Sequence, residues 1–470
     1  MSRTTRHSVL EHPDPSPAST RGGGWVAWLL AVAAAGVVAL GAPRQGAAEA
    51  RPPVVVTPGS ERTFRIALQL FADGSVAPDR ADVSAFRDEI VAGLDFSGVF
   101  QVIDFDAFLG PTVTEGLDNE EVLANCGDWT QIGADGMVDG RLIVEAQNFT
   151  AEFRVWDGTR CSRLVAKRYR QDVSGEVDAV AKRIADDIVG AFVGQRGVSS
   201  TEIAFVSTRT GNPEIFVMDA DGRSARAATK NGSINVFPSW SPGGDAIVYT
   251  SYRHLNRPFL FLSARGGRRP GGRVLDSLEI EGQQFRGVFD PSGERLALVL
   301  SSDEPAEIFT VNVSGGDLRR LTRNRSIDVS PSWSPDGEQI AFVSDRSGSP
   351  QVYVMDADGG NIRRLTYDGG YNSAPAWSPD GLWIAYESRV GGQFDIWLID
   401  PHGGSSVPLV SHPASDEAPT WAPNARKLAF SSMRRGRSDI YVIDVNGDNL
   451  RRITRNAGDN KNPAWGRYPR

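Results

Sequence analysis

The sequence predicts a six-bladed β-propeller that follows a small mixed α/β domain. One observation is a recurring segment, which reads PSWSPDG at residues 331–337, and whose anchors Trp333, Trp377, Trp421 and Trp465 lie 44 residues apart. An interval of this size is typical of one propeller blade. A second observation is the number of strand-like pieces. Their number in each interval indicates how one blade is built, and their number along the chain indicates how many blades there are.

Each repeat contains four strand-like pieces. A Trp strand and a Pro-Asp-Gly turn precede an apolar run such as 340–343, and an alternating run follows at 351–355. The sequence Asp-Ala-Asp-Gly at 356–359 then leads to a short piece at 363–366. Asp-Gly between alternating apolar runs is a strong hairpin signal. Four short antiparallel strands form one blade, and a ring of blades leaves only short sheet edges.

The count of strands indicates how the ring closes. The second strand of the repeat occurs six times, beginning at Ile203, Ile247, Leu296, Ile340, Ile384 and Leu428. The Trp-type strand also occurs six times, but none precedes Thr201, and the last one, at Trp465, has no partner strands after it. We therefore expect the C-terminal strand to complete the blade that begins at Thr201, within a propeller that spans residues 201–470.

The first 61 residues indicate export. Residues 1–50 contain an apolar run at 25–42 and a small-x-small pattern at 48–50, which together predict a secretory signal peptide. An uncleaved N-terminal anchor is the alternative, and the folded part is exported in both cases. Residues 51–61, RPPVVVTPGSE, are expected to be extended because prolines exclude a helix. This segment is either a terminal linker or a strand that pairs with a partner's sheet edge through Val54, Val55 and Val56.

A mixed α/β domain is predicted over residues 62–195. Strand patterns occur at 64–71, 99–103, 136–144, 152–156 and 163–170. Apolar residues at helical spacing predict helices over 82–94, with Asp82 as the N-cap, and over 176–192. The apolar stripe of the second helix, which includes Val180, Ile184 and Ile188, is ordinary core packing.

Charge and cysteine content restrict the partners and the compartment. The net charge of −8 argues against nucleic acid or an anionic membrane as the main partner, because both require clustered cations. The two cysteines, Cys126 and Cys161, precede the propeller and do not form a CxxC motif. In an exported chain such a pair predicts a disulfide, and two buried free thiols are the alternative.

The residues required for catalysis or for metal binding do not occur in a recognisable pattern. A propeller-linked peptidase requires a G-x-S-x-G nucleophile elbow and a partner histidine, and the sequence contains no such pentad. Beyond the signal region, His254, His402 and His412 fall in different blades. The Asp-Ala-Asp-Gly segments lack the distal Glu of an EF-hand loop and are better explained as turns. We therefore expect no catalytic residue, no metal site and no cofactor; a peptidase-related protein, or a small ligand or cation in the central channel, remains the alternative.

The order of these parts resembles the TolB family, the periplasmic propeller proteins of the Tol–Pal system of Gram-negative bacteria. The segments that carry the resemblance are Ser97–Phe100 with Ile103-Asp104, Gly133–Gly136 before Val138, Thr201–Phe205, and Pro463–Trp465. The chain departs from the family pattern at Phe289-Asp290, which replaces Trp-Ser, at the Gly/Arg-rich insertion 265–273, and in its cysteine pair.

The resemblance implies a non-enzymatic role in outer-membrane integrity and in constriction at cell division. It implies that the propeller binds the peptidoglycan-associated lipoprotein Pal, and that the extreme N-terminus engages the inner-membrane protein TolA. Segment 51–61 contains no motif that can be matched to the family, so its residues are assigned only by position. The mature protein is expected to be a periplasmic monomer that does not insert into a membrane.

The resemblance also suggests where a Pal-like partner docks. In a four-stranded meander, the Pro-Asp-Gly and Asp-Ala-Asp-Gly turns share one face, and the loops that enter each Trp strand share the other. The second set of loops varies between blades, and variable polar loops on a rigid ring are common recognition sites. Without the resemblance, these loops could equally be solvated connections. The predicted contact residues are Asn235, Gln283, Arg286, Asp328, Asn372, Asp416, Glu417 and Asn460.

Overall fold

The computed structural model describes residues 63–69, 71–73, 83–108, 126–145, 148–172, 177–264, 282–302, 304–455 and 458–468. Several sequence-based predictions therefore lie outside the described residues. They concern the signal peptide at 1–50, the segment 51–61 with Val54, Val55 and Val56, the N-cap Asp82 and the insertion 265–273. These remain predictions.

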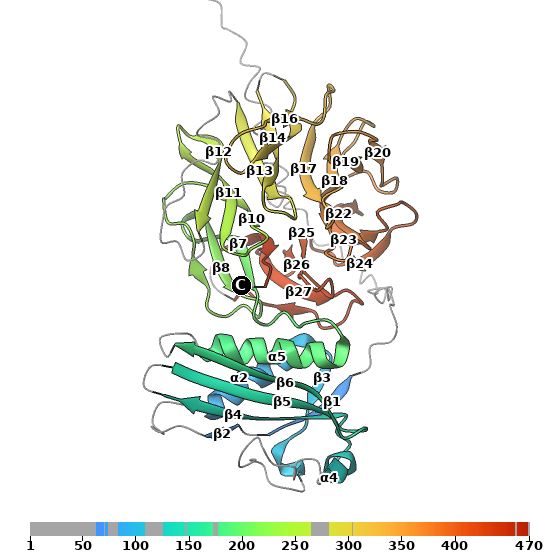
Figure 1. The fold of residues 1–470 in the computed structure, drawn as a ribbon. Coiled ribbons are helices and arrows are strands. Elements are labelled where there is room, and N and C mark those ends of the chain that lie inside the picture. The colour runs from blue at the N-terminus through green and yellow to red at the C-terminus, as the bar shows by residue number, and fades with distance from the viewer. Residues whose placement is uncertain are drawn as a thin grey trace, which may run out of the picture. The chain divides into compact units, whose positions relative to one another are not determined.

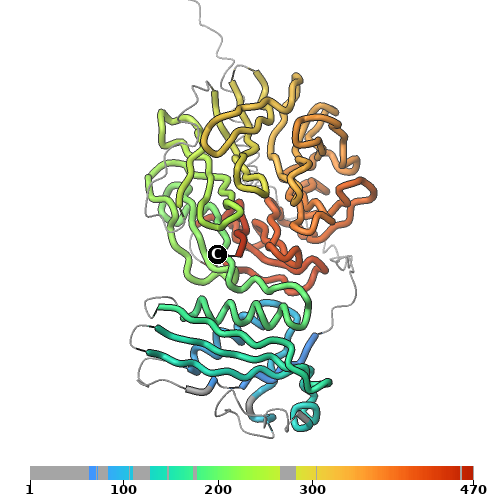
Figure 2. Tube along the Cα trace, in the orientation of Figure 1, coloured from blue at the N-terminus to red at the C-terminus, as the bar shows by residue number. Residues whose placement is uncertain are grey.

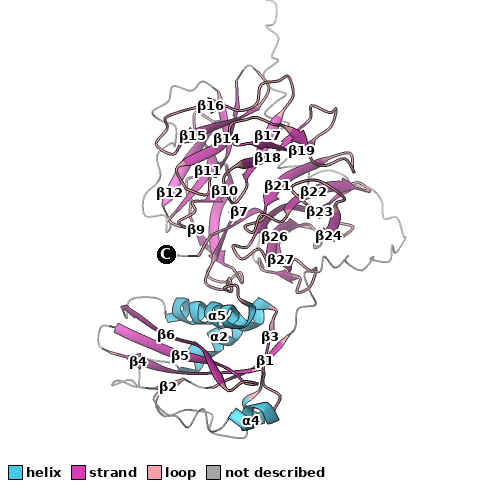
Figure 3. Ribbon diagram, turned by 45° about the vertical axis from the view of Figure 1, so that its right-hand side comes forward, coloured by secondary structure: helices cyan, strands magenta, loops and turns pink. Residues whose placement is uncertain are grey.

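The N-terminal domain is a twisted mixed sheet with two long helices on one of its faces (Figure 3). The strand order is β3-β1-β4-β5-β6, and β2 also pairs with β4. Strand β1 is parallel to β3 and β4, whereas β4, β5 and β6 form an antiparallel meander. The strands are β1 (Phe64–Leu68), β2 (Ala72–Asp73), β3 (Phe100–Val102), β4 (Gly136–Val144), β5 (Asn148–Asp157) and β6 (Ser162–Asp172).

The helices form where apolar residues recur at helical spacing. Helix α2 covers Val83–Ser97 and helix α5 covers Val177–Val193. Val180, Ile184 and Ile188 of α5 are buried in the core, as the stripe predicts, because they pack against the apolar face of the sheet. The short helices η2 (Phe105–Ala107) and α4 (Cys126–Gln131) were not predicted. A single turn or two of helix is too short to show an apolar period.

The propeller consists of six sheets arranged around an axis (Figure 1). Their strands, from the innermost outward, are β29 (Asn460–Trp465), β7 (Glu202–Thr210), β8 (Asn212–Asp219) and β9 (Arg226–Ala227) in blade 1; β10 (Asn235–Trp240), β11 (Ala246–His254) and β12 (Arg257–Ala264) in blade 2; β13 (Gln283–Phe289), β14 (Arg295–Ser301), β15 (Glu307–Asn312) and β16 (Arg319–Arg320) in blade 3; β17 (Asp328–Trp333), β18 (Gln339–Ser344), β19 (Gln351–Asp356) and β20 (Arg363–Arg364) in blade 4; β21 (Asn372–Trp377), β22 (Ile384–Val390), β23 (Gln393–Ile399) and β24 (Val407–Val410) in blade 5; and β25 (Asp416–Trp421), β26 (Lys427–Ser432), β27 (Asp439–Asp444) and β28 (Arg451–Arg452) in blade 6.

Blade 1 combines the two ends of the propeller sequence, as the strand count predicts. Strand β29 pairs antiparallel with β7, with Trp465 opposite Ile203 and Asn460 opposite Ser207. Figure 2 shows the red C-terminal strand beside the green start of the propeller. This pairing removes the free sheet edges that an open array of blades would leave.

Every innermost strand contains a bulge at the same position. The register of each strand shifts there, and one non-glycine residue adopts a φ between 46° and 56°. A bulge bends the strand and re-aims the side chains beside it. Five of the six bulge residues line a cavity of about 200 Å³ along the propeller axis. The six bulge residues are Phe237, Arg286, Ser330, Ala374, Ala418 and Asn462.

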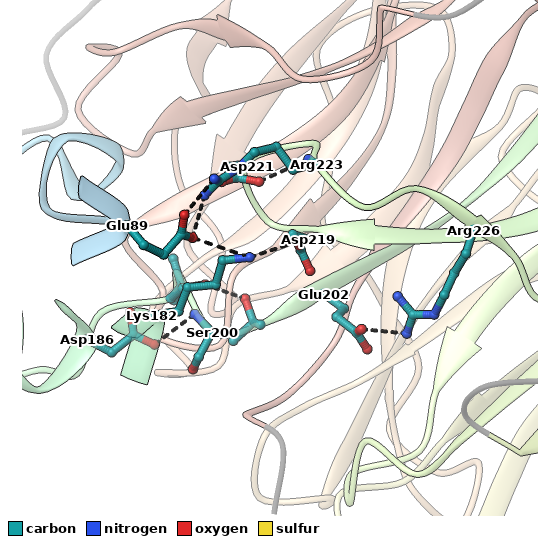
Figure 4. Close-up of polar contacts among 11 residues, drawn as sticks. Glu89, Lys182, Asp186, Ser200, Glu202, Asp219, Asp221, Arg223 and Arg226 are labelled. Carbon is teal, nitrogen blue, oxygen red and sulfur yellow. Dashed lines mark hydrogen bonds and ion pairs between the residues drawn. The ribbon is translucent and has the colours of Figure 1, made fainter. Parts of the chain in front are cut away.

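The N-terminal helices contact the propeller through the turns of blade 1. Glu89 of α2 accepts two hydrogen bonds of 2.6 Å from Arg223, which follows the Asp-Ala-Asp-Gly turn (Figure 4). Lys182 of α5 donates a 2.7 Å hydrogen bond to Asp219, which begins the same turn. Glu89 is buried between two cations, so its carboxylate is a paired rather than an isolated buried charge.

Blade 6 contributes a second set of contacts on the same side of the ring. Arg451 donates to the Asp95 carboxylate at 2.7 Å and to the Asp95 carbonyl at 2.9 Å. Asn424, in the turn after Trp421, donates to the carbonyl of Arg196 at 3.1 Å. The turns of blades 1 and 6 are therefore partly covered by the chain's own N-terminal domain.

Candidate functional site

The candidate site is the propeller face that carries the loops into the innermost strands, which we call the mouth face. The opposite face, which carries the Pro-Asp-Gly and Asp-Ala-Asp-Gly turns, we call the turn face. All eight predicted contact residues lie at or near the beginning of an innermost strand. Asn235, Gln283, Asp328, Asn372, Asp416 and Asn460 are first residues of such strands; Glu417 follows Asp416, and Arg286 is the bulge residue of β13.

Burial corrects the assignment of five of these residues. The side chains of Asn235, Asp328, Asn372, Asp416 and Asn460 have an exposed fraction of 0%. They therefore present no surface to a partner in this structure. The sequence could not separate them from solvated loop residues, because all are polar and directly precede an apolar strand.

The two buried aspartates each neutralise an arginine of their own blade. Asp416 accepts two hydrogen bonds of 2.9 Å from Arg434, and Asp328 accepts bonds of 3.1 and 3.0 Å from Arg346. Burial raises the pKa of both aspartates above the ordinary value, and the arginines oppose this shift. Charge reversal at Asp416 would consequently disrupt the blade rather than test docking.

The three buried asparagines connect neighbouring blades. The Asn235 side-chain amide donates to Glu214 of blade 1 at 2.9 Å, and that of Asn372 donates to Gln351 of blade 4 at 2.8 Å. Asn460 donates to Asp439 of blade 6 at 3.3 Å. These bonds satisfy buried polar groups at the seams between blades and hold the ring in register.

Gln283 is half-buried at the start of β13. The residue that corresponds to Asp328 is its neighbour Gln284, because Trp333 and Phe289 both follow this position by five residues. Gln284 is buried and accepts a hydrogen bond from the Leu260 backbone at 3.3 Å. In blade 3, Gln284 therefore forms a hydrogen bond to the preceding blade, as the buried asparagines do elsewhere.

Arg286 lies in the channel and bridges three blades. Its guanidinium donates to Ser330 of blade 4 at 2.9 Å and lies 4.2 Å from the ring centroid of Phe237 in blade 2. Its backbone N–H donates to Thr250 of blade 2 at 3.1 Å. Burial lowers the pKa of Arg286, and the Glu387 carboxylate partly offsets this effect. Arg286 is therefore a fixed cation in the lining of the channel.

A pair of acidic residues lies at the seam between blades 5 and 6. Glu387, in β22, accepts hydrogen bonds from the Ser373 hydroxyl at 2.5 Å and from the Ala418 N–H at 2.8 Å. Among the described residues, one carboxylate oxygen of Glu417 is buried without a hydrogen-bond donor. Burial, together with the charge of Glu387, raises the pKa of Glu417 to about 7. Part of the acidic pair is thus protonated near neutral pH.

Glu387 was not among the residues selected from the sequence, because it occupies a strand position whose pattern predicts a core residue. The corresponding residue is Val206, Val299 or Val343 in three other blades. A single acid at a position that is apolar in three other repeats is the signal that could have identified it.

The mouth face also carries exposed apolar side chains that the sequence reasoning did not select. Leu255, in the turn between β11 and β12, is 74% exposed, and Tyr367, in the loop that enters blade 5, is 71% exposed. Ile234, which precedes β10, and Val390 in blade 5 are 37% and 41% exposed. Aromatic and aliphatic side chains that a partner can bury are common anchors of a protein interface. The sequence signal that could have identified these residues is a large apolar residue within an otherwise polar loop.

The described part of the chain contains no cluster of three or more His, Cys, Asp or Glu side chains with the geometry of a metal site. Within the same residues, none of the helices has the length and apolar character needed to traverse a bilayer. Cys161 is disulfide-bonded. The side chain of Cys126 is outside the described residues, so its pairing with Cys161 remains a prediction.

Two family descriptions match the chain in the same order as its domains. The family described as "TolB amino-terminal domain" matches residues 52–164, and that described as "TolB beta propeller domain" matches residues 191–469. The second match spans more than half of the sequence. The chain belongs to the TolB family.

Relatives of this TolB-family chain carry the same family name. The "Tol-Pal system protein TolB" of Anaeromyxobacter dehalogenans is 34% identical over 293 residues, which cover 61% of this chain and 63% of that protein. The protein of the same name from Geobacter sulfurreducens is 39% identical over 172 residues, which cover 37% of each chain. The match thus spans less than two thirds of the length of the first of these relatives.

A solved structure shares the fold. The crystal structure of TolB from Acinetobacter baumannii has a TM-score of 0.73 at 21% sequence identity, and the match covers 87% of this chain and 97% of that one. The predicted architecture, a six-bladed propeller preceded by a small α/β domain, is confirmed by this likeness and by the sheet topology. The resemblance to the TolB family stated from the sequence is likewise confirmed.

Proposed function

We propose that this protein is a non-enzymatic, periplasmic component of the Tol–Pal system whose mouth face binds a Pal-like peptidoglycan-associated lipoprotein. In this role it connects inner-membrane Tol proteins to the outer membrane, and so supports outer-membrane integrity and constriction at division. Membership of the TolB family and the names of the relatives support this role.

The observation that carries the docking face is the unequal use of the two sides of the ring. On the turn face, blades 1 and 6 already contact helix α2 through Arg223 and Arg451, and Asp219 of blade 1 accepts a hydrogen bond from Lys182 of helix α5. The mouth face presents Leu255 and Tyr367, the two most exposed large apolar side chains of the described residues. The loop of Tyr367 leads into β21, whose first residue, Asn372, is anchored by buried hydrogen bonds, so a partner meets a surface that is already ordered there.

The proposed contact surface therefore differs from the residues selected by sequence. The exposed residues Ile234, Leu255, Tyr367 and Val390 form its apolar part. Arg286 and Glu417, which are half-buried, supply charge at the channel, and the five buried residues hold the loops in place.

Export and the N-terminal contact belong to the same proposal. The mature chain would begin near Arg51, after the predicted signal peptide, and would fractionate with periplasmic proteins. Segment 51–61 would pair with the sheet edge of a TolA-like inner-membrane protein through Val54, Val55 and Val56.

Site-specific photo-crosslinking tests the docking face. A photoreactive amino acid is placed at Leu255 in one variant and at Leu382 in the other, and the purified Pal-like lipoprotein of the same organism is added. Leu382 is a suitable control because it is 63% exposed but lies in a Pro-Asp-Gly turn on the turn face. Crosslinking from position 255 and not from 382 is expected; crosslinking from 382 alone would show that the turn face binds the partner.

A further inference from the structure

A second cavity lies at the seam between blades 6 and 1. Its volume is about 380 Å³, and it shares no lining residue with the cavity that surrounds the propeller axis. Its lining includes three arginines, one aspartate and the apolar side chains of Met218 and Ile453. The charged lining residues are Arg209, Arg223, Arg455 and Asp221.

Arg209 occupies a position that recurs in the propeller. Like Arg346 and Arg434, it donates from Nε to the hydroxyl of the serine two residues earlier, at 2.9 Å compared with 2.8 Å in the other two blades. Each of the three guanidinium groups also lies over an aromatic ring of its own blade; that of Arg209 is 4.5 Å from the Phe216 ring centroid. The local geometry of the three arginines is therefore the same.

The partner of Arg209 differs in charge. Arg346 and Arg434 face the carboxylates of Asp328 and Asp416, whereas Arg209 faces the side-chain amide oxygen of Asn460 at 3.2 Å. An amide is required there because Asn460 also donates to Asp439 of blade 6. Within the described residues, Arg209 forms no ion pair, and burial lowers its pKa. Its charge is consequently not neutralised by the chain.

Among the other charged side chains of the cavity, one more arginine lacks an ion-pair partner within the described residues. Arg223 forms ion pairs with Glu89 and Asp221, so these three side chains satisfy one another. Arg455 is exposed and, like Arg209, has no ion-pair partner in the part of the chain that the structure describes. Two unpaired guanidinium groups, Arg209 and Arg455, therefore line one cavity in a chain whose net charge is −8.

We propose that this cavity is a binding site for an oxyanion, either a carboxylate or a phosphate group, held between Arg209 and Arg455. Guanidinium groups match the planar geometry of a carboxylate and the oxygen pairs of a phosphate, and such charge-assisted hydrogen bonds are stronger than neutral ones. The partly enclosed seam screens these charges less than open solvent does. Free phosphate and the carboxylate of an acidic peptide are the two sources of this chemistry.

The seam between blades 3 and 4 provides a matched control. Arg323 follows Thr322 as Arg455 follows Thr454, and the neighbouring blade presents Arg346 as blade 1 presents Arg209. At this seam Asp328 neutralises Arg346. An anion attracted merely by exposed arginine would respond equally to Arg323→Gln and to Arg455→Gln.

The test is isothermal titration calorimetry at pH 7 and low ionic strength, with inorganic phosphate in one arm and N-acetyl-leucyl-glutamate in the other. The mature chain should bind at least one of these probes at a single saturable site. Arg455→Gln should weaken that binding at least tenfold, and Arg323→Gln should leave it unchanged. Binding in only one arm assigns the source of the oxyanion.

Arg209→Gln should also weaken binding, and a thermal melt establishes whether that variant is folded. Because Arg455 is exposed and forms no ion pair within the described residues, its variant decides the outcome even where Arg209→Gln unfolds. Failure of both probes to saturate, or an equal loss in Arg323→Gln and Arg455→Gln, would overturn the proposal.

Discussion

Trp465 and Ile203 face each other across the antiparallel pair of β29 and β7, although they come from opposite ends of the propeller sequence. The Trp465 indole N–H donates to the Thr201 hydroxyl at 2.8 Å, and the indole is buried. Every other blade is formed by consecutive strands, so this contact is the step that converts a row of blades into a ring.

Loss of Trp465 should therefore destabilise the whole propeller. Trp465→Ala leaves a cavity in the core of blade 1 and removes the indole hydrogen bond to the Thr201 hydroxyl, at a cost of about 3–5 kcal/mol. Removal of residues 460–470 should cost more, because it also exposes the edge of β7. Urea unfolding followed by circular dichroism measures both effects; unchanged thermal stability of the truncated protein would show that the ring does not depend on this strand.

Asp416 should contribute to stability through Arg434. Asp416→Ala leaves a largely buried guanidinium without its carboxylate, at a cost of about 3–5 kcal/mol. Asp416→Asn should cost less, because Asn460 accepts a hydrogen bond from Arg209 at the same position of blade 1. Urea titrations at pH 7 compare the two variants, and an Ala variant as stable as the wild type would remove the structural role assigned to this residue.

Glu417 should make stability depend on pH in the direction opposite to an ordinary ion-paired acid. Because its pKa is about 7 in the folded chain and near the ordinary 4.5 when unfolded, the folded state holds the proton more tightly. Its contribution is complete below the unfolded pKa and is lost as pH rises towards 7 and above. Glu417→Gln should therefore raise the free energy of unfolding relative to wild type at pH 8, by about 1–3 kcal/mol, and much less at pH 5.

The control for this pH effect is Glu338→Gln, because Glu338 is an exposed residue in a turn of blade 4. Its variant should follow the wild-type pH profile. Identical profiles for the wild type and Glu417→Gln would show that the acidic pair does not retain a proton.

The predicted disulfide should be visible chemically. Cys161 is disulfide-bonded and the chain has two cysteines, so Cys126 is the predicted partner. Denatured, unreduced mature protein should contain no titratable thiol, and reduction should release two. Two thiols before reduction would favour the alternative of free cysteines.

The propeller was predictable because each blade repeats the same turn residues and the same alternation of apolar residues. The turn segment Pro335–Gly337 and the apolar run at 340–343 specify a hairpin whatever surrounds them, and repetition adds independent support for the period. The N-terminal strands and the two long helices were predictable for the same local reason. Helix α4 was not, because six residues are too few to show a period.

The position of the eight candidate residues at the beginning of the innermost strands was predictable, but their burial and contacts were not. Asp416 and Glu417 are adjacent acids at the start of the same strand, yet Asp416 is buried against Arg434 whereas Glu417 lies near Glu387 of the preceding blade. These differences arise from contacts between blades, which no periodicity within one repeat can indicate. Exposure of Leu255 and Tyr367 likewise depends on what the folded ring leaves uncovered.

Binding of a Pal-like lipoprotein to the mouth face can be measured by a binding titration. The purified lipoprotein of the same organism is titrated against the wild type, the double variant Leu255→Ser/Tyr367→Ser, and the turn-face control Leu382→Ser. Each substituted residue is more than 60% exposed, so all three proteins should have the same melting temperature.

We expect the double variant to bind at least tenfold more weakly than the wild type, equivalent to about 1.4 kcal/mol, and the control to bind as the wild type does. Unchanged affinity in the double variant together with a loss in Leu382→Ser would contradict this expectation, because the partner would then dock on the turn face.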